Sequence, residues 1–159
     1  MRDAGLSELR ALASRRGGIV IADKRLPHDE FLRMMARAWL TWSPEGFGWD
    51  CIRHYEAAAA FSVPVINQPT IVRYQPLLDR VHALYYDADV PGALTTVIES
   101  ALADLDRLRR IATAARQQVA THHLTPWHRA EQLRRYHAGL EDPPGELTIR
   151  EPTEPMAPP

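Results

Sequence analysis

Four short apolar runs alternate with segments of helical periodicity along the first half of the chain. The runs lie at residues 19–22, 40–43, 63–66 and 83–86, and their β-branched and aromatic side chains are typical of strands. Helical segments are expected from about Pro27 and from about Asp50 to Phe61. Strands that alternate with helices predict βαβ units with right-handed crossovers. We therefore expect an α/β fold, a Rossmann-like parallel sheet with helices on both faces.

The second half of the chain has a different pattern. Apolar residues recur at helical spacing over two long stretches after Asp89, and a last helix is expected around Thr125 to Ala138. From Glu141 onward the chain is rich in Pro and in acidic residues, with almost no apolar periodicity. We therefore predict one domain over residues 1–140, in which long helices follow the sheet, and a disordered Pro-rich tail over residues 141–159.

Composition excludes several classes of protein. A chain of 159 residues with 45% hydrophobic residues suits one globular domain, and its net charge of -1 offers no overall electrostatic surface for nucleic acid. No apolar stretch approaches the roughly 20 residues of a membrane helix, and the N-terminus lacks the apolar segment of a secretory signal. We therefore expect a cytoplasmic protein without a transmembrane segment. The single cysteine, Cys51, excludes an internal disulfide.

The stretch from Ser43 to Ala57 carries the strongest chemical signal. It reads S-P-E-G-F-G-W-D-C-I-R-H-Y-E-A, and the run V-P-V-I follows at residues 63–66. The pattern predicts a strand, a glycine-containing loop, a helix start and an acidic residue further along that helix. Open parallel sheets bind ligands beyond the carboxyl ends of their strands, where glycines let the backbone approach phosphate and helix N-termini present free N–H groups. The spacing is neither GxGxxG nor a P-loop.

This stretch resembles the donor-binding domain of GT-B glycosyltransferases, of the glycosyltransferase-group-1, spore-maturation-like and exostosin-like branches. The resemblance rests on the order and spacing of a few residues and extends to about Tyr136. They are Ser43, Gly46, Gly48, Asp50, Arg53, Glu56-Ala57 and Val63-Pro64-Val65. The resemblance implies a glycosyltransferase that transfers a sugar from a nucleoside-diphosphate sugar to an acceptor, without a metal or other cofactor.

The resemblance also implies roles for individual residues of the donor site. Gly46, Phe47 and Gly48 would line the diphosphate, and Glu56 would bind the ribose, because an ionised carboxylate accepts hydrogen bonds from two vicinal hydroxyls. Trp49 is a candidate for stacking on the base or the sugar. Arg53 would contact phosphate and Asp50 would orient Arg53, which completes the set of donor-binding residues. No catalytic residue is assigned.

Three departures from the family pattern stand out. In the common E-x7-E version the first glutamate lies eight residues before the second, where this chain has Gly48, whereas Glu45 lies eleven residues before Glu56. The glycine usual between helix and strand is replaced near Phe61-Ser62, where positive φ would strain a bulky residue, so we expect local divergence or a different cap there. The acceptor domain and the upstream Arg/Lys pair would precede residue 1. We therefore expect the isolated chain to be incomplete and inactive, with the missing half supplied by an acceptor domain or a partner chain.

Three of these expected donor-site residues also have a simpler structural interpretation. Asp50 is a favourable helix N-cap, Arg53 is placed for surface ion pairs with Asp50 or Glu56, and Glu56 itself is a candidate for an ordinary solvated charge. The late helices carry an arginine cluster that is expected to form a solvated face or to dock an acidic partner or a phospholipid surface. These arginines are Arg107, Arg109, Arg110, Arg116, Arg129, Arg134 and Arg135. For the whole chain, the alternative function is a non-catalytic Rossmann-like module that binds a nucleotide or another protein.

Overall fold

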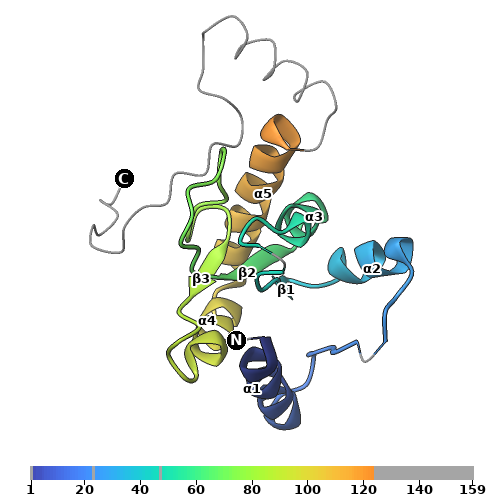
Figure 1. Cartoon of the computed structure of the whole chain (residues 1–159). Helices are drawn as coiled ribbons and strands as arrows, with labels where there is room; N and C mark the ends of the chain where they lie inside the picture. Colours follow the sequence, from blue (N-terminus) through green and yellow to red (C-terminus); the bar gives the residue numbers. More distant parts are fainter. Residues whose placement is uncertain (1, 23, 47, 124–159) are drawn as a thin grey trace, which may run out of the picture.

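Five helices and three strands make up the part of the chain that the computed structural model describes, residues 2–22, 24–46 and 48–123 (Figure 1). In chain order they are α1 (Arg2–Arg15), α2 (His28–Met35), β1 (Leu40–Trp42), α3 (Ile52–Ala59), β2 (Val63–Asn67), β3 (Leu84–Tyr86), α4 (Ala93–Leu102) and α5 (Leu105–His122). The expected helix near Thr125 and the expected tail at 141–159 lie outside the described residues. No described helix has the length and apolarity needed to cross a membrane.

The strands form one parallel sheet in the order β1-β2-β3. Leu40 pairs with Val63 at one side of β2, and Val65 pairs with Leu84 at the other. Because the strands are parallel, their carboxyl ends meet at one edge of the sheet. This arrangement confirms the predicted α/β, Rossmann-like class and three of the four predicted strands.

Pro64 lies in the central strand rather than at an edge. It is tolerated because the ladder toward β1 uses its two neighbours: the N–H of Val63 donates to the carbonyl of Trp39, and the carbonyl of Val65 accepts from the N–H of Ser43. The missing N–H of Pro64 therefore removes no hydrogen bond from this side of the strand. All five residues of β2 are buried, as expected for the middle strand of a covered parallel sheet.

The predicted strand at residues 19–22 was wrong. These residues adopt no regular secondary structure, and they pair with none of the described strands. Ile19 and Ile21 instead pack against the core beside α1, while the side chain between them, Val20, is 74% exposed. Alternate burial thus explains the sequence pattern, but a strand also needs a hydrogen-bonding neighbour, which the pattern does not report.

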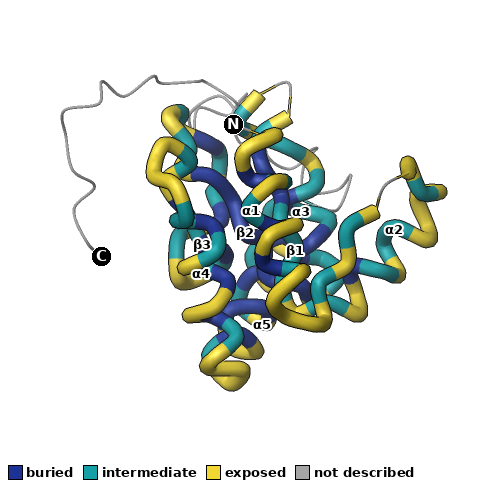
Figure 2. The backbone as a smooth tube through the Cα atoms, turned by 90° about the horizontal axis from the view of Figure 1, so that it is seen from below, coloured by how far each residue is buried: buried dark blue, intermediate teal, exposed yellow. Residues whose placement is uncertain are grey.

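Helices cover both faces of the sheet, as predicted. On one face α1 and α4 pack on β2 and β3, through Leu9, Leu12, Val65, Tyr86, Leu94 and Ile98. On the other face α3 and the second half of α5 pack on β2, through Ala58, Ile66, Ala115 and Val119. The first half of α5 packs with α4 on Val63 and Leu84. In Figure 2 the central strand is dark throughout, whereas α2 projects from the rest with a largely exposed surface.

The expectation of local divergence or a different cap in the turn between α3 and β2 was wrong, because the ordinary left-handed turn is kept with a bulky residue in it. The N–H of Ser62 donates to the carbonyl of Ala57 and the N–H of Phe61 to that of Ala58, which are the two bonds of a Schellman motif. Phe61 occupies the left-handed position with φ 61°. The Arg116 guanidinium lies 4.5 Å from its ring centroid, so the bulky residue is held by a cation–π contact.

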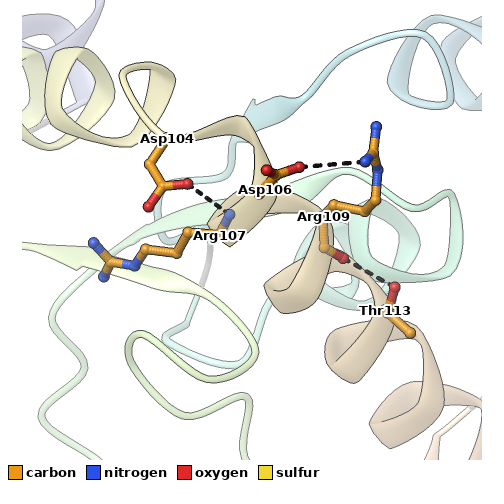
Figure 3. A network of polar contacts seen from close by, with 5 residues as sticks. All are labelled: Asp104, Asp106, Arg107, Arg109 and Thr113. Carbon is orange, nitrogen blue, oxygen red and sulfur yellow. Dashed lines mark hydrogen bonds and ion pairs between the residues drawn. The ribbon is translucent and has the colours of Figure 1, made fainter.

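Two of the described arginines of α5, Arg109 and Arg116, make separate side-chain contacts. At the start of the helix the Asp104 carboxylate caps the N–H of Arg107 at 2.9 Å, and Arg109 lies 3.4 Å from the Asp106 carboxylate (Figure 3). Arg109 also lies over the ring of Trp39. Arg129, Arg134 and Arg135 lie outside the described residues, so whether the whole cluster docks a partner is left untested.

Candidate functional site

A buried histidine of α3, His54, holds the loop that follows β1 at both of its ends. The Ser43 hydroxyl lies 2.7 Å from Nδ1 of His54 on α3, and Nε2 of His54 lies 3.2 Å from the carbonyl oxygen of Trp49. A carbonyl only accepts, so Nε2 carries the proton and Nδ1 accepts from the Ser43 hydroxyl. Burial lowers the pKa of His54 to about 4, so the ring is neutral at physiological pH.

A second buried side chain holds the same loop from the end of β2. The Asn67 Oδ1 accepts from the backbone N–H of Glu45 at 2.8 Å, and its Nδ2 donates to the Glu45 carboxylate at 3.3 Å. Asn67 is fully buried. The two contacts fix Glu45 beside β2. The loop therefore has a defined path at the carboxyl edge of the sheet, which is where ligands of such folds bind.

Helix α3 begins two residues later than predicted, at Ile52, with Cys51 at the N-cap and no side-chain capping bond. The alternative in which Asp50 caps the helix was therefore wrong. The Asp50 carboxylate accepts a hydrogen bond from the hydroxyl of Tyr55. Tyr55 in turn stacks on the ring of His123 at the end of α5, with ring centroids 4.3 Å apart. Asp50 thus links the loop to α3 and, through Tyr55, to α5.

A cleft of about 820 Å³ lies between the segment that leads into α2, the end of β1 and the first turns of α3. We call it the basic cleft and define it by its ionisable lining residues, Arg2, Lys24, Arg25, His28, Arg53 and Glu56. The Glu56 side chain is 19% exposed, and its Oε1 lies 3.8 Å from Nε2 of His28. Glu56 is therefore not the fully solvated helix charge of the simpler interpretation.

A second cleft, of about 750 Å³, lies between α2 and α3 and shares His28, Ile52 and Glu56 with the basic cleft. Asp50, Tyr55 and His123 also line it. Its remaining lining side chains are mostly apolar or small, so it offers fewer charges than the basic cleft. The exposed face of α3, with Ile52 and Glu56 one turn apart, forms a wall common to both clefts.

The structure brings together only some of the residues expected in the donor site. Arg53 and Glu56 both line the basic cleft, and Asp50 lines the cleft between α2 and α3. Gly46, Gly48 and Trp49 line neither of the two clefts. Phe47 lies outside the described residues. Among the described ion pairs none involves Arg53, so the simpler role of a surface ion-pair partner finds no contact in this part of the chain.

Neither loop glycine is required by the fold as described. Both have ordinary backbone angles, because the described glycines with positive φ are Gly18 and Gly92. A Cβ at Gly48 would meet nothing within 4 Å, and one at Gly46 would meet only the Cys51 sulfur at 3.7 Å. By contrast, a Cβ at Gly5 on α1 would lie 2.5 Å from the Trp42 ring. Glycine at positions 46 and 48 therefore has no packing reason within the described residues.

Sequence reasoning missed a buried arginine in the loop after β2. Arg73 is only 7% exposed, and its Nη2 donates to the Tyr85 hydroxyl at 2.5 Å, which donates onward to the Leu77 carbonyl. Its Nη1 is buried without a hydrogen-bond partner. The nearby guanidinium also contributes to the lowered pKa of His54. No periodic pattern marks this residue, because arginine in a polar loop is ordinarily exposed.

No group of three or more His, Cys, Asp or Glu side chains within residues 2–22, 24–46 and 48–123 is placed to hold a metal ion. The rings of His122 and His123 both lie edge-on to the ring of Tyr74. Nε2 of His123 also lies 2.9 Å from the carbonyl oxygen of Gln75. Reaction without a metal is still a prediction, because the structure does not test it.

Among known proteins, similarity to this chain is found in the fold of a solved structure and not in sequence. No family model matches the chain, and no curated protein matches it. Among solved structures, the chain is similar to sucrose-phosphate synthase from Thermosynechococcus elongatus, with a TM-score of 0.60 and 17% sequence identity over 85% of this chain and 35% of that one. The chain therefore spans little more than a third of the length of that protein. At this identity the likeness concerns the fold alone, and it agrees with the predicted α/β, Rossmann-like class.

Proposed function

We propose that this domain binds the nucleotide-sugar donor of a glycosyltransferase, in the basic cleft. The observation that carries the proposal is that Arg53 and Glu56, which the family resemblance assigns to phosphate and ribose, line the same cleft. Glu56 lies one helical turn from the start of α3. One helix thus presents a guanidinium for phosphate and a carboxylate for vicinal hydroxyls, with its N-terminus at the carboxyl edge of the sheet.

Two further observations support the proposal. The fold is similar to that of sucrose-phosphate synthase. The loop that precedes α3 is held by hydrogen bonds of Ser43, His54 and Asn67. A Cβ added at Gly46 or Gly48 would clash with no described atom. Glycines without a structural reason beside a fixed helix start suit a backbone that a phosphate group approaches closely. Sugar transfer also requires an acceptor, which we propose is bound by another domain or chain.

Calorimetric titration of the chain with uridine, guanosine and adenosine diphosphates tests the proposal. We expect at least one of them to bind. Glu56→Gln keeps the shape of the side chain but removes the charge that strengthens hydrogen bonds to ribose, so it should weaken binding by about 1–3 kcal/mol without unfolding the domain. If no nucleoside diphosphate binds the parent, or if Glu56→Gln binds as tightly as the parent, the donor site is assigned wrongly.

The loop glycine offers an independent control. Gly48→Ala should leave the unfolding free energy within about 0.5 kcal/mol of the parent, because the added Cβ meets nothing within 4 Å. It should weaken diphosphate binding if the loop backbone approaches the phosphates. Gly5→Ala is the matched contrast, because its Cβ would clash with Trp42, and it should destabilise the fold. A Gly48→Ala chain with undiminished affinity would remove the loop from the site.

A further inference from the structure

Two exposed aromatic side chains lie at the amino edge of the sheet, where β1 and β2 begin. Trp39 directly precedes β1 and Phe61 lies two residues before β2, with exposed fractions of 40% and 50%. The N–H of Val63 donates to the carbonyl of Trp39 at 2.9 Å, so the two segments lie next to each other. Exposed aromatic side chains that neighbour one another are typical of surfaces that bind another segment or protein.

Helix α5 places one arginine on each of these rings. The Arg109 guanidinium lies 5.9 Å from the ring centroid of Trp39, and that of Arg116 lies 4.5 Å from the ring centroid of Phe61. The two arginines are two helical turns apart, so they lie on one side of α5, about 10.5 Å from each other along its axis. Leu105, one turn before Arg109 and 44% exposed, extends the same side. We call these five residues the aromatic–arginine surface.

The carboxylates near this surface do not use all the donors of its arginines. Asp106 lies 3.4 Å from Arg109, and Asp104 caps the backbone N–H of Arg107 (Figure 3). None of the described ion pairs includes Arg116, whose Nη1 donates to a backbone carbonyl of α3. A guanidinium carries five N–H donors, so both arginines of the surface have donors left for a further carboxylate.

The acidic, proline-rich part of the chain contains a segment whose spacing matches this surface. Residues 151–155 read E-P-T-E-P, so Glu151 and Glu154 are three residues apart, and so are Pro152 and Pro155. In the polyproline II helix, which such sequences favour, three residues make one turn of about 9 Å, so both carboxylates come to the same side. This spacing is close to the about 10.5 Å between the two arginines along α5. Segments of the P-x-x-P type bind in this conformation to surfaces lined by aromatic side chains.

We propose that residues 151–155 bind to the aromatic–arginine surface of the same chain. The two carboxylates of the segment pair with Arg109 and Arg116, and its two prolines cover the rings of Trp39 and Phe61. Hydrogen bonds between arginine and carboxylate are stronger than those between neutral groups, and aromatic and arginine side chains supply much of the binding energy of many interfaces. The inference is independent of the proposed function, because this surface lies at the amino edge of the sheet and the nucleotide is proposed to bind at the carboxyl edge.

The connection from the described part of the chain is long enough for this contact. Residues 151–155 lie outside the described residues, and residues 124–150 join them to His123 at the end of α5. Arg109 lies about 20 Å from His123 along the helix, whereas the 27 connecting residues span up to about 90 Å when extended. Because the segment is tethered, its effective concentration is of the order of 1 mM, so a weak contact is enough to keep much of it bound.

The test measures how close the segment comes to Trp39 in the full chain. Cys51 is the only cysteine, so the variant Cys51→Ser/Met156→Cys carries a single nitroxide label directly after the segment. The readout is the nuclear magnetic resonance signal of the Trp39 indole N–H, which a nearby nitroxide weakens. We expect this signal to be about two-fold weaker, or more, than with the reduced, diamagnetic label, because at least half of the tethered segment is bound. The indole N–H signal of Trp49, in the loop between β1 and α3, should keep its intensity.

Neutral variants of the surface test the role of its two arginines. Arg109→Gln/Arg116→Gln in the labelled chain should restore the Trp39 signal. The matched control, Arg15→Gln/Arg16→Gln, removes the same charge from exposed positions at the end of α1, on the other face of the sheet, and should leave the weakening unchanged. Thermal unfolding of both variants verifies that the domain is folded.

Variants of the segment test the other half of the contact. Glu151→Gln/Glu154→Gln removes its two carboxylates and should also restore the Trp39 signal. Glu141→Gln/Glu146→Gln removes the same charge from another part of the acidic stretch and should have no effect. All four positions lie outside the described domain, so this pair of variants decides the question even if the arginine variant unfolds.

Each result decides for or against the inference. A Trp39 signal of full intensity in the labelled chain overturns it, and so does an equal effect of Glu141→Gln/Glu146→Gln, because the contact is then one of net charge. If labelled chains weaken the Trp39 signal of unlabelled, isotope-enriched chains to the same extent, the segment binds a second copy, and the inference is again wrong. None of these results bears on nucleotide binding, so the proposed function stands or fails separately.

Discussion

The hydroxyl of Ser43 and Nδ1 of His54 lie 2.7 Å apart, and both side chains are fully buried. Ser43 directly follows β1, whereas His54 belongs to the first turn of α3. The contact closes the intervening loop into a ring of fixed size, and the bond from His54 to the Trp49 carbonyl subdivides that ring. A neutral histidine thus sets the shape of the loop between β1 and α3.

His54 should make folding stability depend on pH. Its pKa is lowered from 6.5 to about 4 by burial, so the unfolded chain binds its proton more tightly than the folded one. The contribution to stability is complete above about pH 6.5 and is lost as pH falls toward 4, by about 3 kcal/mol. Chemical denaturation at pH 4.5, 5.5 and 7.5 measures it.

The matched variant for this pH effect is His54→Gln, which has no titrating group. It should be less stable than the parent at pH 7.5, but the difference between the two should shrink as the pH falls. Subtracting the two pH profiles removes the contribution of His82 and His123, whose pKa values burial also lowers. Parallel profiles for parent and variant would show that His54 does not titrate as the structure implies.

Replacing Asn67 should loosen the loop between β1 and α3. Asn67→Ala leaves the half-buried N–H of Glu45 without its acceptor and should cost about 1–3 kcal/mol of unfolding free energy. Gln68→Ala, at the next and exposed position, is the control and should change stability by less than about 0.5 kcal/mol. Faster amide hydrogen exchange at Glu45 and Gly46 in Asn67→Ala would locate the effect, and equal exchange in both variants would contradict it.

The left-handed conformation of Phe61 predicts a difference between two small substitutions. Phe61→Gly and Phe61→Ala both remove the ring that Arg116 contacts, but only glycine adopts φ 61° without strain. Phe61→Gly should therefore be more stable than Phe61→Ala by about 1 kcal/mol in thermal or denaturant unfolding. Equal stabilities would show that the turn relaxes when the side chain is shortened.

The Arg73–Tyr85 pair should be strongly coupled. Tyr85→Phe removes the only hydroxyl that Arg73 contacts among the described residues, leaves a buried guanidinium unsatisfied and should cost about 3 kcal/mol. Adding Arg73→Met removes that stranded charge, so the double variant should be more stable than Tyr85→Phe alone. A double-mutant cycle on unfolding free energies measures the coupling, expected to be about 1–2 kcal/mol. Additive effects would contradict the contact.

Much of the sheet could be predicted because its signals are local. The runs 40–43, 63–66 and 83–86 are rich in strand-forming side chains, and all three form parallel strands. The placement of Arg53 and Glu56 on one helix near the carboxyl edge also follows from residues close together in the sequence. The same signal failed at 19–22, because alternating burial against α1 produces the pattern of a strand without its hydrogen bonds.

The parts of the candidate site that could not be predicted join segments distant along the chain. Asn67 and Glu45 meet across 22 residues, and no motif marks either of them as a partner of the other. Arg73 is buried because the loop after β2 folds over Tyr85. Lys24 and Arg25 share a cleft with Arg53 because the segment before α2 stays outside the sheet.

The sequence by itself determined three of the parallel strands, their alternation with helices and the glycine loop at the end of β1. These features depend on the periodicity and backbone preferences of a few neighbouring residues. Only the tertiary structure decided which charges share the basic cleft and which polar side chains hold the loop. Such contacts arise from the packing of helices on both faces of the sheet, and packing depends on the shapes of segments that the local pattern does not connect.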